Sequence, residues 1–112
     1  MIWALRIFFT FVIVTMLSVT TWASLRESIL DIPPAVTGDP WFVATLFDAY
    51  FGFLTFFIWV AYKERSMVSR GVWLAAILVL GNLAMATYAL VQLFKVPATA
   101  MLHDVLLRRE AA

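Results

Sequence analysis

The sequence predicts an all-α membrane protein with three transmembrane helices and a short C-terminal interfacial helix. Apolar residues make up 64% of the 112 residues and charged residues only 13%. A soluble domain of this size could not bury that much apolar surface. The apolar residues form three stretches of the roughly 20 residues that a bilayer-spanning helix needs. Tryptophans lie at the ends of these stretches, as expected for headgroup level.

The first predicted span covers about residues 2–23, between Trp3 and Trp22. These two tryptophans are about 28 Å apart along a helix, close to the thickness of a hydrocarbon core. The apolar run is longer than in a signal peptide, and Thr21-Trp22-Ala23 is a poor cleavage site. We therefore expect a retained helix, followed by a loop over residues 24–40.

The second and third spans are predicted at about residues 41–62 and 72–94. Asp39 and Pro40 are typical of an N-cap and a first helical residue, so a helix should begin there. Trp41 and Trp59 bracket the second span, and Trp73 opens the third after a short basic link.

The last segment, about residues 98–109, is expected to be an amphipathic helix lying on the membrane surface. It follows Pro97, and its apolar side chains share one helical face: Ala98, Met101, Leu102, Val105 and Leu106. It is too short to be a fourth span. The whole chain, residues 1–112, is thus interpreted as a single membrane domain.

Basic residues decide the orientation only weakly under this three-span prediction. One side carries Arg6, Lys63, Arg65 and Arg70, and the other carries Arg26, Lys95, Arg108 and Arg109. With four basic residues on each side, the positive-inside rule barely favours either orientation. The cluster in the short second link favours the cytoplasmic side. We therefore expect a multi-pass protein of the cell inner membrane, with a cytoplasmic N-terminus and a periplasmic C-terminus.

Composition argues against several function classes. The chain has no cysteine and one histidine, His103, so alone it cannot supply a thiolate metal site or a bis-histidine haem. A lone interfacial histidine is more often solvated than catalytic. The scattered glycines form no phosphate-binding loop, and a net charge of +1 does not indicate a nucleic-acid-binding protein. With no nucleophile–base pair visible, we expect a non-enzyme without cofactor, metal or nucleic-acid partner.

Asp48 is the ionisable residue deepest in a predicted span, about 10 Å below Trp41. A carboxyl group at that depth is costly and usually faces protein or a water-filled cavity. Other polar residues fall at a similar depth or nearer the outer side, which gives a candidate intramembrane cluster: Asp48, Asn82, Thr15, Thr45 and Tyr88. Either Asp48 and Asn82 hydrogen-bond and fix the helix register, or the cluster is a proton, ion or headgroup site.

Lys63 and Glu64 are interpreted as charges at a solvated helix end. They also belong to a familiar pattern. The segment from Asp39 to Tyr50, its continuation to Glu64, and the string from Leu80 to Ala86 resemble a family of small bacterial and plant membrane proteins, domain of unknown function 1475. The resemblance covers about residues 22–94. It implies no activity, only that Asp48, Lys63, Glu64 and Asn82 belong to the family pattern.

Three functions are compatible with these observations. The first is a non-catalytic accessory or scaffold subunit, whose partners are the lipid bilayer and another membrane protein or further copies of the chain. The second is a small oligomeric proton-coupled transporter using Asp48, although comparable small exporters have four spans. The third is a lipid- or quinone-handling protein that would depend on Asp48, Asn82 and Tyr88.

Overall fold

In a computed structural model, which describes residues 1–108, the chain is helical with no strand in that range. The all-α prediction is therefore confirmed. In chain order the elements are α1 (Ile2–Arg26), the 3₁₀ turn η1 (Ile29–Asp31), α2 (Pro34–Thr37), α3 (Pro40–Lys63), α4 (Met67–Leu80), α5 (Asn82–Phe94) and α6 (Leu102–Leu106).

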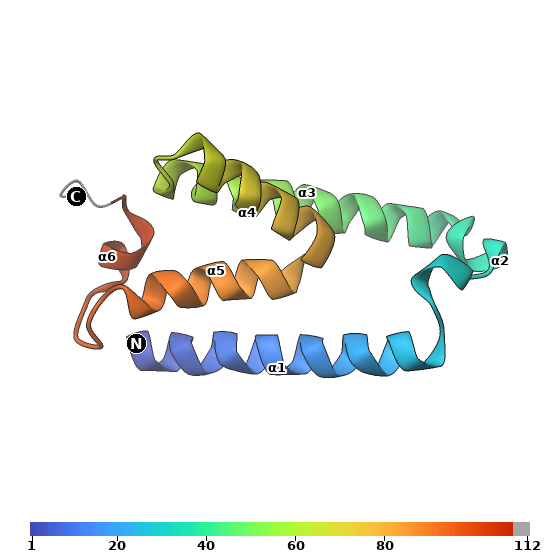
Figure 1. Ribbon diagram of the computed structural model, residues 1–112, viewed down its shortest axis with the longest axis horizontal. Helices are drawn as coiled ribbons and strands as arrows, with labels where there is room; N and C mark the ends of the chain where they lie inside the picture. Colours follow the sequence, from blue (N-terminus) through green and yellow to red (C-terminus); the bar gives the residue numbers. More distant parts are fainter. Residues whose placement is uncertain (109–112) are drawn as a thin grey trace.

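The long helices α1 and α3 lie on opposite sides of the molecule, with α5 between them and α4 packed along α3 (Figure 1). Among the described residues, α1 and α3 are the helices long and apolar enough to cross a membrane. Asp39 caps α3, because its carboxylate accepts a hydrogen bond from the Trp41 N–H at 2.9 Å. The limits of both helices agree closely with the first two predicted spans.

The prediction of a third span over residues 72–94 is wrong. The apolar run is divided at Gly81 into α4, of 14 residues, and α5, of 13 residues. Each is about 20 Å long, short of a hydrocarbon core of about 30 Å. The chain runs out along α4, turns, and returns along α5 to the end from which it started (Figure 1).

Gly81 makes this reversal possible. Its φ is +58° with ψ −125°, a conformation that other residues rarely adopt. A Cβ at this position would also lie 2.8 Å from Cζ of Phe53. The amide of Gly81 still donates to the Ile77 carbonyl and its carbonyl accepts from the Met85 N–H, so the turn keeps helical hydrogen bonds on both sides.

The hairpin of α4 and α5 brings α6 to the same end of the molecule as the N-terminus (Figure 1). This arrangement gives no support to the expectation that the two termini lie on opposite faces, and the C-terminal residues 109–112 lie outside the described part of the chain. That expectation assumed that the third apolar run continues in one direction, whereas Gly81 reverses it.

The predicted surface helix is also shorter than expected. α6 covers Leu102–Leu106, after a loop, whereas the prediction began at residue 98; its predicted end at residue 109 lies outside the described residues. Val105 is buried in a small core with Ile2, Leu93 and Val96. At least this part of α6 therefore packs inward against the helices.

The buried residues are concentrated at the end where the hairpin lies. A second core contains Val60, Ile77, Ala84 and Tyr88, from α3, α4 and α5. By contrast, the buried residues of α1 are Ile2 and Arg6 alone, and that of α3 is Val60 alone. The C-terminal half of α1 and the N-terminal half of α3 are left largely uncovered.

Candidate functional site

The predicted intramembrane cluster is dispersed over the molecule. Asp48 and Asn82 are both exposed, Thr15 is half-buried, and Tyr88 is completely buried. The Thr45 hydroxyl donates to the Trp41 carbonyl within its own helix, at 2.8 Å. No hydrogen bond joins Asp48 to Asn82 in the part of the chain that the structure describes.

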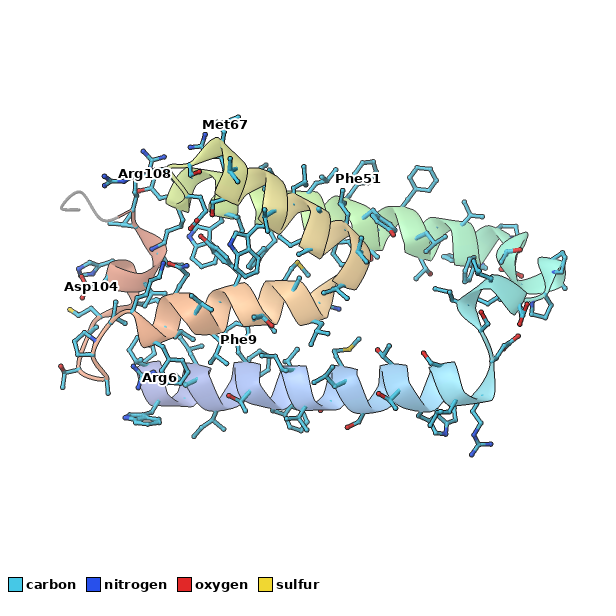
Figure 2. The ribbon with its side chains drawn as sticks, viewed as in Figure 1. Arg6, Phe9, Phe51, Met67, Asp104 and Arg108 are labelled. Atoms are coloured by element: carbon cyan, nitrogen blue, oxygen red, sulfur yellow. The ribbon has the colours of Figure 1, made fainter. Side chains whose placement is uncertain are left out.

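Asp48 lies on the uncovered half of α3. It is eight residues from the start of the helix, which corresponds to about 12 Å. Its neighbour Phe51 is 62% exposed and points away from the other helices (Figure 2). Within residues 1–108 no group pairs with the Asp48 carboxyl, so the fold leaves it open to whatever surrounds α3.

A different polar group is built into the other end of the molecule, around Glu64. Tyr88, at 0% exposure, donates its hydroxyl to Oε2 of Glu64 at 2.9 Å. Ser69 donates its hydroxyl to Oε1 of the same carboxylate. This carboxylate therefore connects α5 to the link between α3 and α4 and to the first turn of α4.

Aromatic rings enclose Tyr88. The rings of Trp73, Trp59 and Phe56 meet it edge-on, with centroids 4.8, 5.4 and 6.2 Å away. Edge-to-face packing fixes the ring direction, so the hydroxyl is held toward Glu64. A buried phenol needs such an acceptor, because an unsatisfied hydroxyl in an apolar core is costly.

The pKa of Glu64 lies below its ordinary value of 4.5. Desolvation raises this pKa, but the hydrogen bonds from Ser69 and Tyr88 and the positive charges of Lys95 and Lys63 together outweigh it. The carboxylate is therefore ionised at neutral pH. It can accept hydrogen bonds and hold the hairpin in place, but it is poorly suited to deliver a proton.

Lys63 and Trp59 hold α6 near the Glu64 carboxylate through hydrogen bonds. The Lys63 ammonium donates to the carbonyls of Val105 and Leu107 at 2.6 and 3.0 Å, and Trp59 donates its indole N–H to the Leu106 carbonyl at 2.9 Å. A cation at the C-terminal carbonyls of a helix is favourable. The predicted helix-end charge of Lys63 thus lies against a helix end, that of α6.

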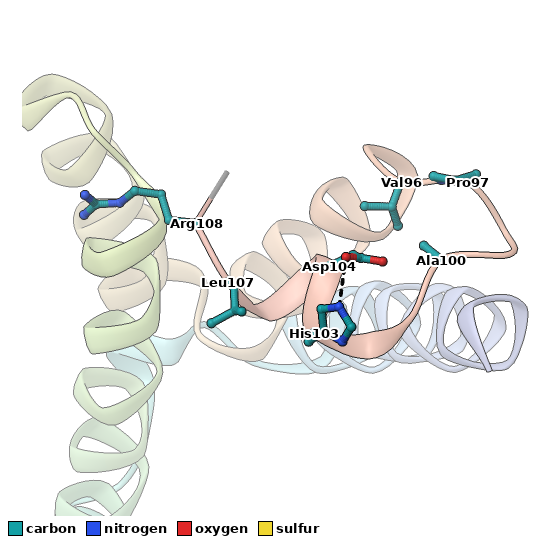
Figure 3. Close-up of a pocket in the computed structure, with 7 residues that line it drawn as sticks. All are labelled: Val96, Pro97, Ala100, His103, Asp104, Leu107 and Arg108. Atoms are coloured by element: carbon teal, nitrogen blue, oxygen red, sulfur yellow. Dashed lines mark ion pairs between the residues drawn. The ribbon is translucent and has the colours of Figure 1, made fainter. Parts of the chain in front are cut away.

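A surface pocket of about 370 Å³ lies between α6 and the loop before it (Figure 3). His103 Nε2 is 3.3 Å from Asp104 Oδ1, and both side chains are largely exposed. Asp104 Oδ2 accepts from the Met101 N–H at 3.0 Å, which caps α6. The remaining lining residues supply no nucleophile: Val96, Pro97, Ala100, Leu107 and Arg108. The Asp104 carboxylate in this pocket thus caps α6, and the His103 side chain is exposed to solvent.

Sequence reasoning named Glu64 and Tyr88 separately and did not pair them. The two are 24 residues apart, and they meet only because the hairpin folds α5 back toward the link at residue 64. No local spacing signals this contact. In the described residues, no group of three His, Cys, Asp or Glu side chains is placed to hold a metal ion.

No curated protein and no solved structure matches this chain. A family match does exist, and it covers residues 1–111, nearly the full length. The matching family is described as "Protein of unknown function (DUF1475)". This confirms the resemblance seen over about residues 22–94 and extends it over the first helix and the C-terminal segment, so the chain belongs to the DUF1475 family.

Proposed function

We propose that this protein is a small, non-catalytic subunit of a membrane assembly. In this proposal α1 and α3 cross the bilayer, and α4 and α5 form a re-entrant hairpin that enters from one face and returns to it. The lengths and apolar character of α1 and α3 support the crossings. The short lengths of α4 and α5 and the reversal at Gly81 support the hairpin.

The arrangement separates the basic residues almost completely. The end that holds the N-terminus, the link after α3 and the C-terminal end of α5 carries most of them: Arg6, Lys63, Arg65, Arg70, Lys95 and Arg108. The other end has Arg26 together with the acids Glu27, Asp31 and Asp39. The positive-inside rule favours a cytoplasmic location for this basic end, and in this proposal the N-terminus and α6 lie on that side.

The exposed carboxyl of Asp48 carries the proposal of an assembly. In the bilayer this side chain lies within the hydrocarbon, on a helix face that no other part of the described chain covers. An acid facing lipid is expensive, so the face is expected to be covered by protein. Thr45, Gly52 and Thr55 lie on the same stripe, are exposed, and let another helix approach closely.

Site-specific photo-crosslinking in cells tests the proposal directly. A photo-crosslinking amino acid at Gly52, next to Asp48, should give a discrete protein adduct. The same probe at Leu46, which is exposed on the opposite side of α3, should give lipid adducts only. Asp48→Leu should reduce the Gly52 adduct, and Glu27→Gln, an exposed acid at the loop, should leave it unchanged.

The mass of the adduct identifies the partner as a second copy or a different protein. Lipid adducts alone at Gly52 in the wild type would overturn the proposal. Asp48→Asn separates the subunit from a proton-coupled carrier, because it keeps hydrogen bonding and removes titration. A subunit keeps its adduct and its function in that variant, whereas a carrier keeps the adduct and loses function.

A further inference from the structure

Arg6 is a cation buried near the N-terminal end of α1. Its side chain is 8% exposed, in the second turn of α1. One terminal nitrogen donates to the carbonyls of Leu93 and Val96, at 3.1 and 2.8 Å. These are carbonyls at the C-terminal end of α5 and just beyond it, so Arg6 caps that helix.

The rest of the guanidinium is only partly satisfied. Its Nε is buried and has no hydrogen-bond acceptor in the described part of the chain, and no carboxylate there pairs with Arg6. Two aromatic rings flank the group, with its central carbon 4.9 Å from the Trp3 centroid and 4.6 Å from that of Phe94. Ring faces attract a cation but do not neutralise it.

A pocket opens beside this group. It measures about 200 Å³ and is lined by Trp3, Arg6, Ile7, Thr10 and Phe94. Figure 2 places Arg6 at the N-terminal end of α1, below the end of α5. Trp3 and Phe94 are about 60% exposed, at 59% and 60%, as expected for aromatic residues at headgroup level.

We propose that this pocket binds a phosphate group, with Arg6 as its counter-ion. A desolvated guanidinium is costly unless it is paired, and the described part of the chain supplies carbonyl dipoles but no anion. Phosphate is the anion that this position would meet, because the pocket lies at the depth of the lipid headgroups. The phosphate can belong to a glycerophospholipid or be free in solution, and the apolar rim of Trp3, Ile7 and Phe94 fits the lipid.

Binding of short-chain lipid to the full-length protein in detergent, followed by native mass spectrometry, tests this assignment. Dioctanoyl phosphatidylglycerol is expected to bind the wild type, and Arg6→Gln should weaken it about tenfold, since a charge-assisted contact is lost. Arg26→Gln is the matched control, because Arg26 also stacks on a tryptophan of α1, Trp22, at the opposite end. It should bind like the wild type.

Thr10→Phe provides a second variant that leaves the Arg6 side chain and its carbonyl contacts in place. Thr10 is exposed on the pocket wall, so the new ring fills the pocket without disturbing the core. It should abolish lipid binding while circular dichroism stays unchanged. Equal binding by wild type and Thr10→Phe would overturn the site, as would binding of dioctanoylglycerol, which has no phosphate, as tightly as the phospholipid.

Inorganic phosphate distinguishes the two sources of the anion. If inorganic phosphate displaces the lipid from the wild type in an Arg6-dependent way, the site binds the free ion. If the lipid binds and inorganic phosphate does not displace it, the site binds the lipid headgroup. The inference rests on the membrane placement of the proposed function but not on a partner. The pocket is at the opposite end from Asp48, so a failed lipid assay leaves the crosslinking result intact, and the reverse is also true.

Discussion

At the scale of single residues, the carboxylate of Glu64 is the centre of the polar interior. It receives the hydroxyls of Ser69 and Tyr88, and the backbone carbonyl of the same residue accepts from Arg70 Nε at 3.0 Å. These contacts join two helices and a link through one side chain. Its loss should therefore loosen the hairpin more than an ordinary surface charge would.

Glu64→Gln is expected to lower the free energy of unfolding at neutral pH and to remove part of its pH dependence. The pKa of Glu64 is lower in the folded protein than its ordinary value of 4.5, so its ionised form stabilises the fold. That contribution is fully present above pH 4.5 and disappears as the pH falls through the lowered folded pKa. Unfolding by sodium dodecyl sulfate in mixed micelles, measured across the acid range, gives the comparison.

Tyr88→Phe and Glu27→Gln are the matched variants for this experiment. Tyr88→Phe keeps the ring packing and loses one hydrogen bond, worth about 1 kcal/mol, and should retain most of the pH dependence. Glu27→Gln should follow the wild type throughout. An unfolding curve of Glu64→Gln with the full pH dependence of the wild type would show that this carboxylate is not the stabilising group.

At the scale of elements, the sequence predicts α1 and α3 well because their signals are local. A continuous apolar run sets the length, and Asp39 with Pro40 marks the start of α3. The hairpin is not predictable in the same way, because hydropathy shows that a segment is apolar and does not show where the chain reverses within it. Gly81 lies inside an apolar run, where nothing local indicates its positive φ or its close approach to Phe53 of another helix.

Gly81→Ala should destabilise the hairpin by about 2 kcal/mol, since an alanine would be strained in this backbone conformation. The ring of Phe53 can swing away from the new methyl group, but the φ cannot relax without unmaking the turn. Gly71→Ala in α4 is the control, because its Cβ would meet nothing within 4 Å. Alanine there should be neutral or slightly stabilising. Equal stability of the two variants would contradict the role given to Gly81.

At the scale of the whole molecule, the reversal decides where the C-terminal segment lies. Sequence reasoning divided the basic residues evenly because it carried Lys95 and Arg108 across the bilayer. Tyr88 was misplaced for the same reason: it was grouped with Asp48 in the candidate cluster, nearer the outer side, but the hairpin brings it to Glu64. The backbone conformation of Gly81 thus controls both where the segment from Lys95 to Arg108 lies and the contact between Tyr88 and Glu64.

Under the proposed placement, cysteine labelling of intact cells should report the link after α3 and the loop after α5 on the cytoplasmic side. The native chain has no cysteine, so single substitutions are clean probes. A membrane-impermeant maleimide should label Val36→Cys in intact cells, and Ser66→Cys and Thr99→Cys only after permeabilisation. All three positions are exposed, so burial does not protect them. A continuous third span would instead expose Thr99→Cys in intact cells, which makes this residue the decisive position.

The turn at Gly81 also gives the molecule an unequal cross-section. With α1 and α3 across the bilayer, the leaflet that contains the hairpin accommodates four of the described helices, and the other leaflet accommodates two. Because each is only about 20 Å long, helices α4 and α5 displace lipid mainly in the leaflet from which they enter. In this proposed placement the protein is wedge-shaped, so lipids would pack more loosely around its narrow part or bend to follow it. A bilayer that already curves toward the narrow side needs the least deformation to surround this shape. Membrane curvature would therefore influence where the protein accumulates.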